Sequence, residues 1–147
     1  MPLPHVQTLL VLPSEPATCR ALLKACQHLP LVQRLVSMAR QLAGIDLESQ
    51  LLNSDVAAST STPAAHAIAC LVAGLAAVEQ FSLEAGVAAV QAASGCLGRG
   101  CGEYAALVFA GCLDLQAAVV LAQVGAGDRA VGTQTARLCG FAADETT

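Results

Sequence analysis

The feature that most constrains the fold of this chain is a glycine-rich segment lying directly before an apolar helical pattern. Residues 94–102 read SGCLGRGCG, with four glycines in nine positions. This density of glycine predicts a tight turn or loop, because glycine adopts backbone conformations that other residues avoid. The small apolar residues 87–93 before it predict a buried strand, and a helix is expected to begin at about Glu103. A strand, a glycine turn and a helix in succession indicate an α/β domain with a parallel sheet.

The amino-terminal third supplies another strand and two helices. The apolar run VQTLLVL at 6–12 ends at Pro13 and predicts a buried parallel strand. A helix is expected over 18–27. Between residues 31 and 42 apolar side chains recur at helical spacing, and Gly44 stands where that helix should stop.

The middle of the chain predicts a helix that is apolar on nearly all sides. Asp46 is expected to cap a short helix through Leu52, and a polar loop is expected over 53–62. Thr62 and Pro63 then form an N-cap with proline at the first helical position. The helix expected at 64–78 is too short to cross a membrane, so we expect a buried helix in the centre of the domain and no membrane span.

Two further helices are expected towards the carboxyl end. The first runs from about Glu103 to a stop at Gly111, and Asp114 caps the second. The sequence Gly-Ala-Gly at 125–127 is expected to break that helix, and the remaining tail shows no periodicity. The expected division is an N-terminal tail (1–5), one domain (6–124) and an irregular C-terminal tail (125–147).

Composition excludes several classes of partner. The net charge is −4 and the seven basic residues are scattered, which argues against nucleic acid. One tyrosine, three phenylalanines and no tryptophan leave little for base stacking. The first residues lack the basic start and cleavage site of a secretory signal, so we expect an intracellular protein of the cytoplasm or an organelle matrix.

The seven cysteines show no metal-binding spacing. None forms a C-x-x-C pair, and the three histidines are scattered. We therefore expect no metal site and no cofactor. An odd number of cysteines without a signal peptide predicts reduced thiols, most of them small core residues.

Two uses compete for the glycine turn. A phosphate cradle would use the G-x-G of residues 98–100, but Glu103 stands where the third glycine of G-x-G-x-x-G should be, and no Gly-Lys-Ser/Thr follows. A nucleophile elbow would place Ser or Cys at the tip of the turn, with small residues two before and two after it. The shape of the turn favours the elbow.

The residues after the turn carry a family resemblance. Residues 102–115, GEYAALVFAGCLDL, resemble the segment after the active serine of malonyl-CoA:acyl-carrier-protein transacylases, where the motif reads roughly G-H-S-L-G-E-Y-x-A-L-V-x-A-G-x-L-x-F. The same segment occurs in acyltransferase domains of fatty-acid and polyketide synthases. Looser likenesses lie at residues 10–13, 44–47 and 61–64. The resemblance covers 6–124, the amino-terminal half of the family's domain, and implies an incomplete acyltransferase (α/β-hydrolase-like) core with a short parallel sheet and several helices.

The family's catalytic residues are not carried over. Without gaps, its serine falls on Gly100 and the preceding histidine on Arg99, while its oxyanion-loop glutamine falls on Glu15 and its carboxylate-binding arginine on Gly125. The family's base histidine would lie beyond Thr147. Glycine offers no nucleophile, and losing parts that act as a unit removes nearly all activity. We therefore expect little or no acyl transfer.

Other residues keep alternative roles open. A shifted alignment of Ser94-Gly95-Cys96-Leu97-Gly98 would make Cys96 the nucleophile, and Cys101 falls in the oxyanion region. Both thiols could equally be core or loop residues. Arg99 could meet a CoA phosphate, and Arg129 could replace the missing arginine.

Three functional hypotheses follow. The first is an impaired malonyl transferase that acts on CoA thioesters and acyl-carrier protein in fatty-acid or polyketide synthesis. The second is a non-catalytic binding or scaffold subunit, and the third is a truncated gene product. Because the strand near Val87 and the apolar helix would lack part of their cover, we also expect a homo-oligomer or a partner subunit.

Overall fold

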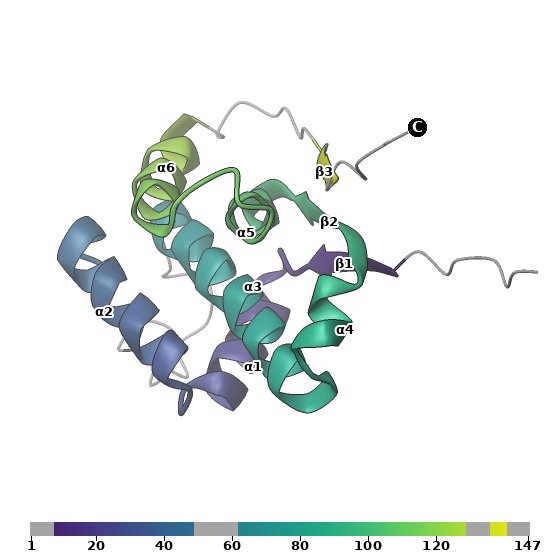
Figure 1. Cartoon of the computed structure of the whole chain (residues 1–147). Coiled ribbons are helices and arrows are strands. Elements are labelled where there is room, and N and C mark those ends of the chain that lie inside the picture. The colour runs from purple at the N-terminus through teal and green to yellow at the C-terminus, as the bar shows by residue number, and fades with distance from the viewer. Residues whose placement is uncertain (1–7, 49–61, 129–135, 141–147) are drawn as a thin grey trace, which may run out of the picture.

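The computed structural model describes residues 8–48, 62–128 and 136–140 (Figure 1). Within these ranges the chain is a mixed α/β protein with six α-helices and a parallel strand pair, which confirms the expected α/β class. The elements are β1 (Thr8–Leu12), α1 (Pro16–Cys26), α2 (Pro30–Ala43), α3 (Pro63–Ala85), α4 (Val87–Gln91), β2 (Ala93–Arg99), the 3-10 turn η3 (Gly100–Gly102), α5 (Glu103–Phe109), α6 (Leu115–Asp128) and β3 (Ala136–Gly140).

The sheet has the strand order β1-β2-β3. β1 and β2 run parallel, with Leu10 opposite Cys96, and β3 pairs antiparallel with the other side of β2. A parallel pair needs a long crossover connection, and here the helices α1 to α4 lie between the two strands in the chain. Leu12 is buried, whereas Leu9 and Val11 are 48% and 69% exposed on the opposite face of β1.

Helix α3 lies at the centre of the fold, with α1, α2, α5 and α6 packed against it (Figure 1). Its most deeply buried large side chains are Ile68, Leu71 and Val72. Small residues allow close approach to α5: a Cβ added at Gly74 would lie 2.7 Å from the Cβ of Ala105. The burial confirms the expectation of a helix packed in the middle of the domain.

The expected helix ends are confirmed at three positions. The Thr62 Oγ1 atom accepts a hydrogen bond from the Ala65 N–H at 3.1 Å, which caps α3. Asp114 Oδ1 accepts from the Ala117 N–H at 2.8 Å and caps α6 in the same way. Gly44 ends α2 in the left-handed conformation, with φ +67°.

Expectations for four segments were wrong. Residues 87–91 form helix α4 rather than a strand, and most of the glycine-rich segment is strand β2, so the turn is confined to η3. Hydrogen bonds to β1 and β3 on both sides hold this segment extended despite its glycines. Helix α6 continues through the Gly-Ala-Gly at 125–127, and the tail expected to be irregular contributes β3.

Helix α3 is also longer than the expected 64–78, which removes the length argument against a membrane span. It has 23 residues, and its most apolar window has a mean hydropathy of 1.5 with 56% of that window buried inside the fold. A core helix of a soluble protein has the same length and composition, so these properties do not distinguish the two. The short helix expected through Leu52 and the polar loop expected over 53–62 lie largely outside the described residues.

Candidate functional site

The turn between β2 and α5 has the geometry of a nucleophile elbow centred on Gly100. Gly100 has φ +58°, in the left-handed region that favours glycine. Two positions earlier, a Cβ at Gly98 would lie 2.6 Å from the carbonyl carbon of Gly102. Two positions later, a Cβ at Gly102 would lie 3.0 Å from the carbonyl oxygen of Pro13. The turn therefore needs its smallest residues on both sides of the apex, as an elbow does.

The apex itself carries no side chain. Gly100 occupies the place where the resemblance puts the serine, so this turn presents no hydroxyl or thiol at its tip. The next residue, Cys101, is partly exposed in η3. Glu103 begins α5 and is 8% exposed, in agreement with a carboxylate that stabilises a helix N-terminus.

Cys96, the nucleophile of the shifted alignment, lies inside β2. Its side chain is fully buried, and its Sγ donates a hydrogen bond to the Ala106 carbonyl oxygen at 3.3 Å. This position differs from the turn apex that the shifted alignment needs. The thiol packs as a small core residue between the sheet and α5.

The remaining sequence candidates lie on different elements. Glu15 is exposed and precedes α1 without a side-chain cap, while Arg99 is exposed at the end of β2. Position 125, where the family's arginine would fall, lies on α6 against Tyr104, and a side chain there would collide with the Tyr104 hydroxyl. Arg129 lies outside the described residues.

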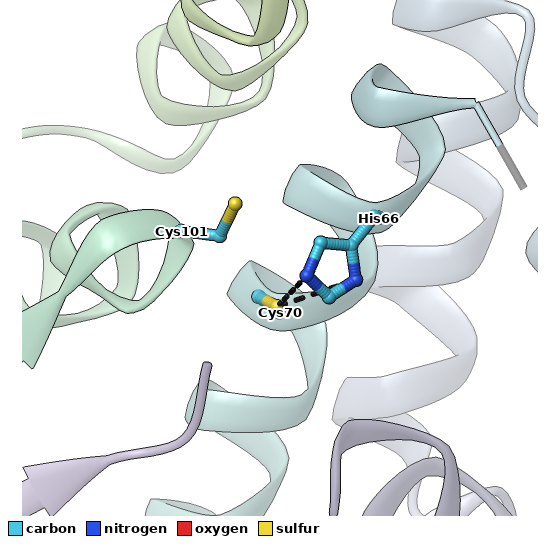
Figure 2. Close-up of side chains that lie close together, drawn as sticks. All are labelled: His66, Cys70 and Cys101. Carbon is cyan, nitrogen blue, oxygen red and sulfur yellow. Dashed lines mark hydrogen bonds between the residues drawn. The ribbon is translucent and has the colours of Figure 1, made fainter. Parts of the chain in front are cut away.

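A group of sulfur and imidazole side chains meets beside this turn. His66 and Cys70 lie on one side of α3, and Cys101 faces them from η3 (Figure 2). The ligand atoms of these three residues all lie within 4.8 Å of one another. The Cys70 Sγ is 3.6 Å from Nε2 and 3.8 Å from Nδ1 of His66. We call these three residues, together with Cys19, the thiol–imidazole cluster.

Cys19 joins the cluster from α1. Its Sγ lies 3.3 Å from the Sγ of Cys70, and the two buried thiols share a hydrogen bond. The Cys70 thiol also lies 3.7 Å from the carbonyl oxygen of Ser14, which follows β1. The cluster therefore sits where the parallel strands β1 and β2 end, the edge at which open α/β sheets bind ligands.

Burial and the neighbouring thiols set the protonation of the cluster. Burial lowers the pKa of His66, against the opposing effect of a hydrogen bond with the Ser14 backbone, so the imidazole is neutral at neutral pH. Hydrogen bonds with Cys101 and Cys19, followed by burial, raise the pKa of Cys70 far above its ordinary value. The hydrogen bond with Cys70 lowers the pKa of Cys19, although burial opposes it. The resting cluster thus contains a neutral imidazole and a protonated central thiol.

Sequence reasoning did not find this cluster. His66 and Cys70 are four residues apart and therefore share one face of a helix. This spacing was the local sign in the sequence that a histidine and a cysteine could lie together. Cys19 and Cys101 come from segments 51 positions before and 31 positions after Cys70, so only the packing of α1 and η3 on α3 brings them in.

Comparison of the chain with models of protein families, with curated proteins and with solved structures finds no significant match. The resemblance to acyltransferases therefore stays a prediction from the motif at 102–115.

Proposed function

We propose that this chain is an acyltransferase-like protein, similar to malonyl-CoA:acyl-carrier-protein transacylases, that has lost the ability to transfer acyl groups. The observation that carries the proposal is the turn at Gly100. The residue that the motif aligns with the serine has φ +58° at the tip of a strand–turn–helix unit, with close-packed glycines two before and two after it. The motif aligns the family's serine with Gly100, and the backbone at Gly100 has the form of a nucleophile elbow. The sequence and the backbone thus support the proposal at the same residue.

Loss of acyl transfer follows from the glycines at positions 100 and 125, which carry no side chain for the reaction. Glycine at the apex offers no nucleophile for a thioester carbonyl. At position 125 the chain has glycine, so no guanidinium is available there to pair with a substrate carboxylate. Since the nucleophile and the carboxylate-binding group act together with the rest of such a site, removing both brings activity close to background.

The function left to such a protein is binding. We infer a scaffold role in fatty-acid or polyketide synthesis, in which the chain holds a CoA thioester or an acyl-carrier protein without reacting with it. Arg99 is exposed at the end of β2, one residue before the turn. Its guanidinium is suited to phosphate, which both CoA and the prosthetic arm of a carrier protein carry.

One experiment tests transfer. The purified chain is incubated with labelled malonyl-CoA and its intact mass is measured, with Cys96→Ala and Cys101→Ala in parallel. We expect no covalent adduct on any of the three proteins. A stable adduct on the wild-type chain that disappears in Cys96→Ala would overturn the proposal in favour of the shifted alignment.

A second experiment tests binding. Calorimetric titration with malonyl-CoA and with holo-acyl-carrier protein should give saturable binding of at least one of them, weakened in Arg99→Gln. Arg34→Gln, which removes an exposed arginine from α2, is the matched control and should bind like the wild-type chain. Absence of binding to both probes would rule out the scaffold role.

A further inference from the structure

We propose that His66, Cys70 and Cys101 form a zinc-binding site that ties α3 to the turn before α5. The spacing of the cysteines in the sequence predicted no metal site, so this site differs from that expectation. It does not depend on the acyltransferase proposal, because it uses the side-chain cluster and not the family motif.

The three ligand atoms are nearly as close together as the ligands of a tetrahedral metal. Zinc lies about 2.3 Å from cysteine sulfur and about 2.0–2.1 Å from histidine nitrogen, so neighbouring ligand atoms stand roughly 3.5–3.8 Å apart. The Cys70 Sγ lies 3.6 Å from Nε2 and 3.8 Å from Nδ1 of His66. With Cys101 included, the three ligand atoms lie within 4.8 Å of one another. Because zinc binds only one of the two His66 nitrogens, closing the site requires side-chain rotations of His66 and Cys101.

The ligand types select the class of metal. Two thiolates and an imidazole favour zinc over calcium or magnesium, which prefer oxygen ligands. The imidazole of His66 binds zinc through the lone pair of one ring nitrogen. Each of Cys70 and Cys101 loses its S–H proton as its sulfur bonds to Zn²⁺, so the bound site is electrically neutral and releases two protons to solvent.

Cys19 does not bind the metal in this proposal but contacts one of its ligands. Its thiol lies 3.3 Å from Cys70 and can donate a hydrogen bond to that sulfur once it is a thiolate. Such outer partners orient metal ligands and tune their affinity. Three protein ligands leave the fourth zinc position to water, and the partial exposure of His66 and Cys101 gives the ion a path from solvent.

The test titrates the full chain, stripped with a chelator under reducing conditions, with Zn²⁺ and separately with Co²⁺ as a spectroscopic probe. We expect one Zn²⁺ per chain with release of about two protons, a rise in Tm, and thiolate-to-cobalt charge-transfer absorption. Cys101→Ser and His66→Ala should lose tight binding. Cys19→Ala should weaken it about 10- to 100-fold. Cys112→Ser, which changes an exposed thiol outside the cluster, should bind like the wild-type chain.

Two results would overturn the site: a wild-type chain without the cobalt–thiolate absorption, or equal zinc affinities for Cys101→Ser and Cys112→Ser. Circular dichroism of the metal-free variants checks their folding. If the single variants do not fold, the wild-type cobalt spectrum and proton count decide the question by themselves.

Discussion

Gly98 lies directly against the carbonyl group of Gly102. A Cβ at position 98 would stand 2.6 Å from the carbonyl carbon of Gly102 and 2.8 Å from the Cα of Glu103. All of these neighbours are backbone atoms, so a side chain at position 98 can be accommodated only by opening the turn between β2 and α5.

We expect Gly98→Ala to lower the free energy of unfolding by about 3 kcal/mol, at the upper end for overpacking. Gly44→Ala is the matched control, because a Cβ there meets nothing within 4 Å and only the φ of +67° is strained. It should cost about 1 kcal/mol. Urea unfolding measures both, and a Gly98→Ala protein at least as stable as Gly44→Ala would contradict the packing of this turn.

The cap of α3 gives a second prediction. Thr62→Ala removes the acceptor of the Ala65 N–H and should destabilise the protein by about 1 kcal/mol. Glu15 occupies the same position before α1 but makes no side-chain capping bond, so Glu15→Ala should change stability by less than about 0.5 kcal/mol. Equal effects of the two substitutions in thermal or urea unfolding would show that the cap does not stabilise α3.

The buried thiol of Cys26 predicts a loss of stability in alkali. Burial, followed by repulsion from Glu84, raises the pKa of Cys26 above its ordinary value of 9.0. The unfolded chain therefore ionises this thiol at a lower pH than the folded chain does. Its contribution to stability is complete below the unfolded pKa and is lost as the pH rises towards the folded pKa.

Urea unfolding between about pH 7 and pH 10 tests this. The wild-type protein should lose more stability over that range than Cys26→Ala, and Cys112→Ala, an exposed-thiol control, should follow the wild-type curve. A Cys26→Ala protein with the wild-type pH dependence would show that another group causes the alkaline loss.

We also propose that the chain self-associates through the exposed edge of β1. Neighbouring helices bury the first half of α3, as far as Ala76, whereas Val11 and Leu9 on β1 are exposed, and β1 is the outer strand of the described sheet. An exposed apolar edge strand is a site for pairing with a second copy, and a lysine there prevents it.

Sedimentation at low micromolar concentration should show a species larger than a monomer, which Val11→Lys converts to a monomer. Leu42→Lys, on an exposed apolar residue of α2, should leave the assembly unchanged. A wild-type chain that sediments as a monomer at these concentrations would exclude self-association.

The sequence by itself determined the elements whose signals are local. Helix α2 follows from the spacing of its apolar residues and ends at Gly44, and the N-caps Thr62 and Asp114 begin α3 and α6 where expected. These features depend on side chains within a few positions of one another, so a single segment contains all the information that they need.

The tertiary structure decided the rest. Residues 94–99 look like a loop by their glycines, yet together with Ala93 they form the central strand because β1 and β3 supply hydrogen-bond partners on both edges. The thiol–imidazole cluster is non-local in the same way, since only the pairing of His66 with Cys70 is visible in one helix. Cys19 and Cys101 reach them because burial of the apolar core packs α1 and η3 against α3, and no spacing of cysteines along the chain encodes that packing.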